Sequence, residues 1–394
     1  MKNYFKILFI AFGVLLFACQ QQTPKVTTQQ IQEIQKEIIP DTRLEYFDVT
    51  VNNDERILHG ATVSEPAFKK LQELAKENDY DFQVELLPEA VFKENPWGIV
   101  TLSVCNMRAK PDHAAELLTQ ALFGTPVKIY RKKGGWYLVQ TPDRYFGWVD
   151  GAGISAKTNA EMLEWKKLPK VIYAEVSGFA YSEPKQNSGV ESDLVLGNLL
   201  SVENEDKEYY KILYPDGREA FVKKNECVST DQWNSKSFTI EDLLKTAFRF
   251  KGVPYLWGGT SPKMMDCSGF TKTAYYFNGL LLQRDASQQT LYGEEISVEN
   301  GYENLEAGDL VFFGRKATED RPERVTHVGL CIGDQKFIHE SGKVRVNSLD
   351  ATSEDYTEHY EKGYVRARRV MNNVDDKGIE WIVDNAFYKM VLPE

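Results

Sequence analysis

A cysteine and two histidines further along the chain are the residues that could do chemistry. Cys267 stands in the sequence MDCSGF, and Gly269 to Phe277 follows with helical spacing, so we expect the thiol at a helix N-terminus. Unpaired backbone N–H groups and the helix dipole favour a thiolate there, which predicts a pKa below the usual value of about 8.5. Such a thiolate is a nucleophile, and it needs a base.

The candidate bases, His327 and His339, lie in two strand-like runs, THVGLCI and KFIHES, joined through Gly333-Asp334. A β-hairpin is the simplest interpretation. A two-residue turn would place the imidazoles on opposite faces, whereas an odd loop centred near Gly333 would pair His327 with His339. If both histidines act together, the loop must therefore have odd length. His327 would then be the base, and His339 would hold its ring in the useful tautomer.

Each of these residues also has an ordinary structural interpretation. A lone cysteine is more often a small buried side chain, and a lone histidine in a strand is more often structural. We assign Cys105 and Cys331, which lie in apolar strand-like runs, to that class. The cysteines form no short CxxC motif and no Cys/His cluster, so we expect no metal site, and their wide spacing predicts no disulfide. The spacing of Cys267 and the two histidines alone therefore suggests a catalytic role but does not decide against the structural one.

The composition is that of a globular protein of several domains. The chain has 394 residues, is 42% hydrophobic and carries a net charge of −11. A surface that binds nucleic acid needs an excess of Lys and Arg, which this chain lacks overall, so we expect no nucleic-acid partner.

The N-terminus predicts export and a lipid anchor. Residues 1–18 join a positively charged start to an apolar run that is too short to span a bilayer, as in a signal peptide. Leu16 to Cys19 resembles a bacterial lipobox, in which Cys19 would receive the lipid; an ordinary secretory signal is the alternative. Residues 19–30 are rich in Gln and are expected to form a tether. The predicted location is the cell envelope, on the periplasmic face of a membrane, with the acyl chains as the only attachment.

A sequence repeat occupies the middle of the chain. Residues 98–155 and 170–230 align without a gap at a constant offset of 73. Short β-rich runs separated by Gly and Pro predict a compact β-barrel for each copy. The matched pairs are Pro111 and Pro184, Gly124 and Gly197, Tyr137 and Tyr210, Val139 and Ile212, Pro142 and Pro215, Trp148 and Phe221, and Val149 and Val222.

The regions that flank these segments suggest no chemistry. Residues 31–97 form a mixed helical region: Gln29 to Ile39 and Ser64 to Glu77 have helical periodicity, and Glu45 to Val51 predicts a strand. The C-terminal extension, residues 371–394, contains the apolar run WIV, which suggests that it packs back onto the body.

Five sequence blocks near the C-terminus resemble the NlpC-type family of papain-like cell-wall peptidases. In chain order they are PYLWGG, DCSGF, LEAGDLVFF, THVGLCIG and FIHES. In that family the Cys attacks an amide carbonyl, the first His is the base and a second polar residue orients it. The resemblance gives these roles to Cys267, His327 and His339, and Tyr255 matches a family tyrosine beside the reacting centre. It implies an α+β fold in which residues 237–370 form a papain-like domain, half helical and half antiparallel sheet.

The repeat resembles bacterial SH3-like domains. Two such units ahead of this catalytic domain resemble the γ-D-glutamyl-L-diamino acid endopeptidases, which trim murein peptides that have a free N-terminal L-alanine. Recognition of an ammonium needs buried acceptors, preferably carboxylates. The resemblance implies five substrate-binding residues: Asp266, Ser268, Ser287, Glu116 and Tyr145. A solvated surface carboxylate is the other interpretation of Glu116.

These observations predict a monomeric cysteine peptidase that needs no cofactor and cleaves after γ-D-glutamate in murein tri- or tetrapeptides. Backbone N–H groups at the start of the Cys267 helix could hold the oxyanion. A second hypothesis is an endopeptidase that opens stem peptides still attached to murein, through a cleft that is open on the alanine side. A third is a non-catalytic wall-binding lipoprotein, against which the presence of both the cysteine and the histidines speaks.

Overall fold

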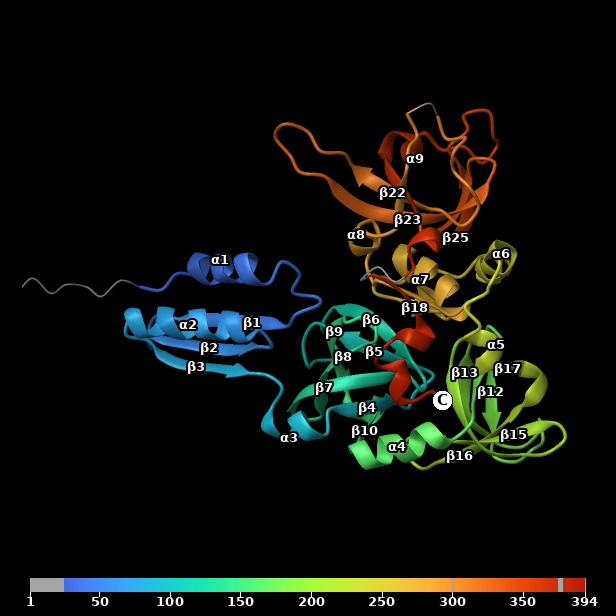
Figure 1. Cartoon of the computed structure of the whole chain (residues 1–394), viewed down its shortest axis with the longest axis horizontal. Coiled ribbons are helices and arrows are strands. Elements are labelled where there is room, and N and C mark those ends of the chain that lie inside the picture. Colours follow the sequence, from blue (N-terminus) through green and yellow to red (C-terminus); the bar gives the residue numbers. More distant parts are fainter. Residues whose placement is uncertain (1–24, 300, 375–377, 394) are drawn as a thin grey trace, which may run out of the picture. The chain divides into compact units, whose positions relative to one another are not determined.

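The computed structural model describes residues 25–299, 301–374 and 378–393 (Figure 1). Its contacts divide the chain into two units: an N-terminal unit of residues up to Pro40 with Phe47–Leu86, and a larger unit of Asp41–Tyr46 with the chain from Leu87 onward. The predicted signal peptide and Cys19 lie outside the described residues. Within the described ranges, no helix is long and apolar enough to cross a membrane.

The N-terminal unit is a small sheet packed with two helices. Strand β2 pairs antiparallel with β1 and parallel with β3. Thr27 caps α1, so this helix begins inside the predicted 19–30 tether, whose last residues are helical. Ser64 caps α2 through a bond from Ala67 N–H, as expected from the Ser and the early Pro of this segment. The elements are α1 (Thr28–Ile38), β1 (Phe47–Asn52), β2 (Ile57–Thr62), α2 (Glu65–Glu77) and β3 (Asp81–Leu86).

The sequence repeat is a structural repeat. The first copy comprises β4 (Trp97–Val100), β5 (Val104–Arg108), β6 (Leu117–Leu122), β7 (Pro126–Lys133), β8 (Trp136–Gln140), β9 (Phe146–Asp150) and β10 (Ile154–Lys157). The second comprises β11 (Lys170–Tyr173), β12 (Ser177–Tyr181), β13 (Val190–Val195), β14 (Leu199–Glu205), β15 (Tyr209–Leu213), β16 (Glu219–Lys223) and β17 (Cys227–Ser229). Each strand of the second copy starts 73 residues after its counterpart, and both sheets have the same strand order. The predicted duplication is confirmed, although no pairing between described residues closes either sheet at its end strands.

Short helices connect these sheets to the rest of the chain. Helix α3 precedes the first copy, α4 joins the two copies and α5 follows the second. Their bounds are α3 (Ala90–Glu94), α4 (Asn159–Lys167) and α5 (Thr230–Trp233).

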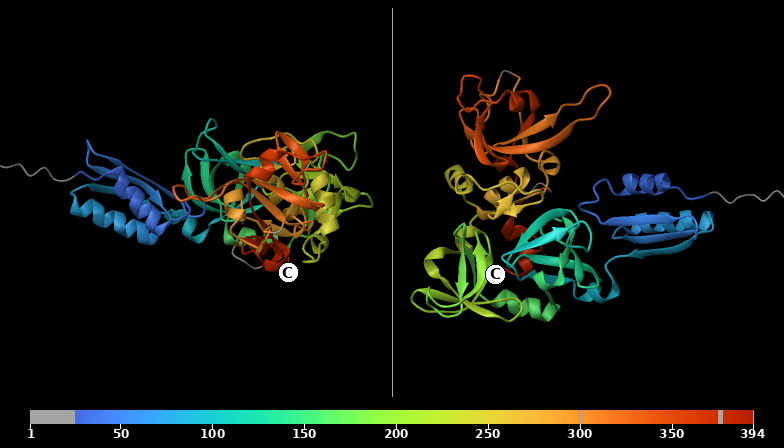
Figure 2. Two further views of the ribbon diagram at one scale, coloured as in Figure 1. Left: turned by 90° about the horizontal axis from the view of Figure 1, so that it is seen from above. Right: turned by 180° about the vertical axis from the view of Figure 1, so that it is seen from behind.

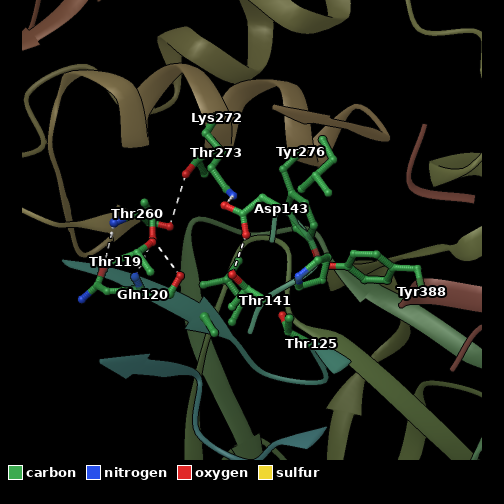
Figure 3. A pocket seen from close by; sticks show the side chains of 14 residues that line it. Thr119, Gln120, Thr125, Thr141, Asp143, Thr260, Lys272, Thr273, Tyr276 and Tyr388 are labelled. Carbon is green, nitrogen blue, oxygen red and sulfur yellow. Dashed lines mark hydrogen bonds and ion pairs between the residues drawn. The ribbon is translucent and has the colours of Figure 1, made fainter. Parts of the chain in front are cut away.

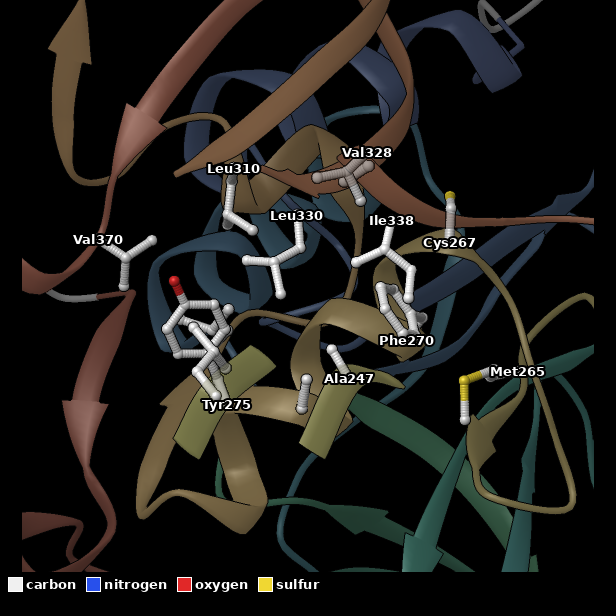
Figure 4. Close-up of a cluster of buried hydrophobic side chains, with 14 of the residues drawn as sticks. Ala247, Met265, Cys267, Phe270, Tyr275, Leu310, Val328, Leu330, Ile338 and Val370 are labelled. Carbon is white, nitrogen blue, oxygen red and sulfur yellow. The ribbon is translucent and has the colours of Figure 1, made fainter. Parts of the chain in front are cut away.

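The catalytic domain packs helices against one antiparallel sheet, as predicted. The helices are α6 (Ile240–Phe248), α7 (Cys267–Phe277), α8 (Ala286–Gln289) and α9 (Glu358–Gly363). The sheet has the order β21-β26-β22-β23-β24-β25. Its strands are β21 (Glu294–Ile296), β22 (Leu310–Arg315), β23 (Arg324–Gly333), β24 (Lys336–Ser341), β25 (Lys343–Ser348) and β26 (Tyr364–Arg369). Apolar side chains of α7 and the sheet, such as Phe270, Val328 and Ile338, form the core, and Cys267 is part of this cluster (Figure 4).

The C-terminal extension packs back onto the body, as its apolar run suggests (Figure 2). Strand β27 (Ile379–Trp381) pairs antiparallel with β20 (Leu280–Leu282). Beyond it, Tyr388 is buried in a cluster that also contains Trp97, Ile172 and Tyr276. These residues come from both repeat copies and from α7, so the extension ties together the three parts of the larger unit.

A buried ion pair joins α7 to the first repeat copy (Figure 3). Lys272, on α7, is paired with Asp143, and both side chains are almost wholly shielded from solvent. The Thr141 hydroxyl also donates to Asp143, at 2.6 Å. The pair borders a cavity of about 50 Å³ that Tyr276 and Tyr388 also line. The helix that begins at Cys267 is therefore anchored to the first copy by charge.

Candidate active site

Cys267 is the first residue of α7, as expected. The Asp266 side chain caps this helix by accepting from Gly269 N–H at 2.8 Å. Cys267 is only 7% exposed. The backbone N–H groups of Val328 and Ser268 donate to its thiol, which places the sulfur beside the strand residue that follows His327.

His327 and His339 lie together, although the predicted turn is wrong. The turn has two residues, Asp334 and Gln335, both with positive φ, and a bulge at Ile332 follows it in the ladder. A two-residue turn alone would place His327 and His339 on opposite faces of the sheet. The extra residue at the bulge shifts the register by one and returns them to the same face. His339 is therefore opposite Gly329 instead of His327, and the two imidazoles are diagonal neighbours on one face. His327 Nε2 and His339 Nδ1 are 2.8 Å apart.

Asn347, on β25, fixes the tautomers of both histidines. Its Nδ2 group donates to the carbonyl of Asp355 at 3.0 Å and to the Thr357 hydroxyl at 2.8 Å, so Oδ1 faces His339 Nε2 at 2.9 Å. His339 Nε2 must then carry the proton, and its Nδ1 accepts from His327 Nε2. The lone pair of neutral His327 is thus left on Nδ1, the nitrogen that must receive the thiol proton.

The protonation states of Cys267 and the two histidines in the resting site differ from the predicted thiolate. Burial raises the pKa of the Cys267 thiol to about 12, and the neighbouring Asp266 carboxylate adds to this. Burial lowers the pKa of His327 to about 3 and that of His339 to about 4. The prediction of a lowered thiol pKa is therefore wrong, because desolvation outweighs the helix N-terminus. The resting pair is a neutral thiol and a neutral imidazole, so His327 must take the proton as the sulfur attacks.

The predicted substrate-binding residues line one cleft with Cys267. The cleft has a volume of about 510 Å³, which is within the range of small-molecule sites. The predicted residues in its lining are Glu116, Tyr145, Tyr255, Asp266, Cys267, Ser268 and Ser287. Neither histidine lines it; His327 instead lines a neighbouring cavity that shares Arg324 and Thr326 with the cleft. Residues far apart in the sequence thus meet around one thiol.

Asp266 is saturated by groups of the protein itself. Arg284, which is buried, donates to both of its carboxylate oxygens, at 3.1 and 2.6 Å. Gly258 N–H, Gly269 N–H and the Ser268 hydroxyl supply three further hydrogen bonds. A carboxylate offers about four lone-pair positions, so Asp266 has none left for a substrate ammonium. Its charge still contributes to the potential of the cleft.

Glu116 and Tyr145, which line the same cleft, leave more capacity for a ligand than Asp266 does. Glu116 is exposed, and Trp257 Nε1 donates to its Oε1 at 2.9 Å. The other oxygen of Glu116, Oε2, receives no hydrogen bond from a described residue. The Tyr145 hydroxyl donates to Asp285 Oδ2 at 3.0 Å. The carboxylates of Glu116 and Asp285 thus line the cleft with the Tyr145 phenol and Cys267, and we call these first three residues the acidic group.

Tyr255 lines the cleft together with Cys267. Burial, followed by the charges of Cys267 and Asp266, raises its pKa to about 12. It therefore stays a neutral hydrogen-bond donor.

Four residues of the site were not predicted. Asn347 sits two strands from His327, and Arg284 and Asp285 directly precede the segment of Ser287. Arg43 lies in the connection between a helix and a strand of the N-terminal region, where no pattern in the sequence points to a cleft. Only the contacts of the folded chain identify these four.

Comparison with known proteins places this geometry in a family. Residues 252–369 match the NlpC/P60 family, and residues 107–154 match the bacterial dipeptidyl-peptidase SH3 domain. A γ-D-glutamyl-L-lysine dipeptidyl-peptidase of Bacillus cereus is 31% identical over 63% of this chain and 74% of its own length. Dipeptidyl-peptidase 6 of Lysinibacillus sphaericus is 29% identical over 64% of this chain and 92% of its own.

A solved structure supports the same assignment. An NlpC/P60 family protein from Bacillus cereus superposes with a TM-score of 0.59 at 26% identity, over 69% of this chain and 99% of that one. The sequence match and the shared fold agree with the geometry of the site, in which a cysteine starts a helix and two histidines share a hydrogen bond. The chain therefore belongs to the NlpC/P60 family and is a cell-wall cysteine peptidase.

Proposed function

We propose that this peptidase hydrolyses the amide bond between γ-D-glutamate and the following diamino acid, in murein tri- or tetrapeptides with a free N-terminal L-alanine. The observation that carries the proposal is the cleft in which Cys267 lies with the acidic group of Glu116, Tyr145 and Asp285. An L-Ala-γ-D-Glu unit has its ammonium at one end and its reactive carbonyl at the other. The cleft offers the matching pair of partners.

The reaction is an acyl transfer. As the Cys267 sulfur attacks the carbonyl carbon, its proton passes to His327 Nδ1, and the carbonyl oxygen becomes an oxyanion. The Ser268 N–H, which faces the sulfur, is placed to stabilise that oxyanion at the helix start. His327 then gives its proton to the leaving amine of the diamino acid, and the C–N bond breaks. Water, deprotonated by His327, attacks the thioester and releases L-Ala-γ-D-Glu with the free thiol.

The ammonium is expected to bind to Glu116, with Tyr145 and Asp285 nearby, because Asp285 already accepts from Arg43 and Tyr145. Asp266 was predicted to take part, but its oxygens are occupied, so we give it the role of capping α7 and pairing with Arg284. The cavity lined by His327 extends the cleft on the side of Arg324, and we assign the leaving diamino acid to it. The names of the Bacillus and Lysinibacillus relatives, which are dipeptidyl-peptidases, support this direction of binding.

The test compares L-Ala-γ-D-Glu-meso-diaminopimelate with its N-acetylated form, using wild-type enzyme and Cys267→Ala and detecting products by mass spectrometry. We expect release of L-Ala-γ-D-Glu from the free amine only, and none with Cys267→Ala. Equal cleavage of both forms would favour an endopeptidase that acts on attached stem peptides. Cleavage of neither form would favour a wall-binding protein without this activity.

We further propose that Cys19 carries a lipid that holds a monomeric enzyme on the periplasmic face of a membrane. The support is the sequence of residues 1–19, with its apolar run and the lipobox-like LFAC. Growth with a labelled fatty acid should label the wild-type protein and leave Cys19→Ala unlabelled. Label in both proteins would refute the anchor.

A further inference from the structure

An arginine outside both matched family regions lies in the cleft. Asp41–Tyr46, the 41–46 segment, belongs by its contacts to the larger unit that contains Cys267, although its sequence neighbours on both sides belong to the N-terminal unit. Arg43 is part of the lining of the cleft. Neither family match, 107–154 or 252–369, includes it. Family membership therefore assigns Arg43 no role.

Three side chains hold the guanidinium of Arg43. Its Nε and Nη2 groups each donate to one carboxylate oxygen of Asp41, both at 2.8 Å. Its Nη1 group donates to Asp285 Oδ2 at 2.7 Å and to the Ser287 hydroxyl at 2.9 Å. These bonds use four of the five N–H groups of an arginine, and two of the partners are charged. The side chain is therefore fixed in position and not a mobile surface group.

The 41–46 segment is bonded both to the first SH3-like copy and to the catalytic domain. Phe146 N–H, from the first SH3-like copy, donates to the Arg43 carbonyl at 2.8 Å. From the catalytic domain, Gln288 Nε2 donates to Asp41 Oδ2 at 2.9 Å. The segment thus connects the two walls of the cleft.

The 41–46 segment contacts the acidic group of the cleft through Asp285. Asp285 Oδ2 accepts from Arg43 and also from the Tyr145 hydroxyl, at 2.7 and 3.0 Å. A substrate whose ammonium reaches this group would therefore lie close to the guanidinium of Arg43.

We infer that Arg43 is a specificity-determining residue that closes the cleft beyond the alanine amine and excludes peptides that continue past it. The inference rests on the proposed function, because it assumes that the alanine end of the substrate points toward Glu116 and Asp285. Acylation of the alanine amine removes its positive charge, and this weakens binding of the substrate whether or not Arg43 is present. The arginine adds a steric barrier, because its fixed side chain fills the space that the acyl group needs.

The experiment measures kcat/KM for L-Ala-γ-D-Glu-meso-diaminopimelate and for its N-acetylated form, and takes the ratio of the two. The ratio is kcat/KM for the free amine divided by kcat/KM for the acetylated peptide. We expect Arg43→Ala to lower this ratio by about tenfold, mainly through faster cleavage of the acetylated peptide. Arg43→Lys, which keeps a long cationic side chain, should retain most of the ratio. Arg218→Ala, which removes an exposed side chain of the second copy, is the matched control and should leave it unchanged.

The ratio separates specificity from stability. If Arg43 only stabilised the fold, both substrates would lose activity in parallel and the ratio would stay at the wild-type value, which overturns the inference and leaves the proposed function intact. If the wild-type enzyme itself cleaved both peptides equally, the proposed function would fall, and the inference with it. A selective wild type with a less selective Arg43→Ala supports both.

Discussion

His327 and His339 share a hydrogen bond of 2.8 Å although they are not opposite each other in the β23–β24 ladder. The bulge at Ile332 makes them diagonal neighbours, and their ring planes are nearly perpendicular, at 88°. This orientation directs one nitrogen of each ring at the other. Asn347 then determines which of the two nitrogens carries the proton.

Asn347→Ala is therefore expected to lower kcat roughly ten- to a hundredfold with little change in KM, because His339 loses the partner that sets its tautomer. The measurement is steady-state cleavage of the free-amine tripeptide. Asn204→Ala, an exposed asparagine of the second copy, is the control. An Asn347→Ala enzyme with a raised KM and normal kcat would show that this residue serves substrate binding instead.

The pH dependence of activity should lack the usual histidine midpoint. His327 acts as a base only when neutral, and burial lowers its pKa from 6.5 to about 3, so it stays neutral in mild acid. We expect kcat/KM to be level from about pH 5 to 8 and to fall toward pH 3. Activity assays after brief exposure to each pH, with recovery checked at pH 7, give the profile. A midpoint near 6.5 would mean that His327 is hydrated in the working enzyme.

The buried pair of Lys272 and Asp143 predicts a strongly coupled double mutant. Lys272→Met leaves the Asp143 carboxylate buried without its cation, and should lower the free energy of unfolding by roughly 3–5 kcal/mol. Adding Asp143→Asn removes the stranded charge, so the double variant should regain part of that loss. Urea unfolding followed by circular dichroism measures both.

A matched exposed pair controls for the loss of any lysine. Lys362 and Glu358 form an exposed i,i+4 pair on α9, and Lys362→Met should cost at most about 0.5 kcal/mol. The double variant is also compared with Lys272→Met and Asp143→Asn measured singly. If the losses in free energy of unfolding of the two single variants simply added in the double variant, the two buried charges would not depend on each other.

Glu340 predicts a loss of stability at higher pH. It is fully buried on β24, and neither carboxylate oxygen has a hydrogen-bond partner among the described residues. Burial, and then the charge of Asp266, raises its pKa from 4.5 to about 7. Between these values the folded chain keeps a proton that the unfolded chain releases. Ionisation therefore favours unfolding as pH rises through this range.

Glu340→Gln cannot ionise and should remove this pH dependence. Relative to wild type, its free energy of unfolding should improve by up to about 3 kcal/mol between pH 4 and pH 8. Unfolding in urea at the two pH values tests this, with Glu358→Gln, an exposed residue of α9, as control. Parallel pH curves for Glu340→Gln and wild type would mean that the Glu340 carboxylate finds a partner in solution.

The sequence was most informative where chemistry and local pattern coincide. The MDCSGF block predicted both a helix start and a thiol there, and constant spacing predicted the duplicated sheets. The two histidines share a face of the hairpin only because of a bulge at Ile332, and no residue preference in the sequence predicts a bulge there. The thiol pKa depends on how many atoms shield Cys267 from water, a sum over the whole fold. Arg43 reaches the cleft only through long-range contacts, which a linear pattern does not contain.

The duplicated sheets give the molecule an internal comparison. Two residues of the first copy that line the cleft with Cys267 are Glu116 and Tyr145, and at the offset of 73 they correspond to Gly189 and Arg218 in the second copy. The second copy reaches the same strand order without an acid or a phenol at these places. The strand order thus does not depend on an acid or a phenol at these two positions, and the second copy shows the same framework without them.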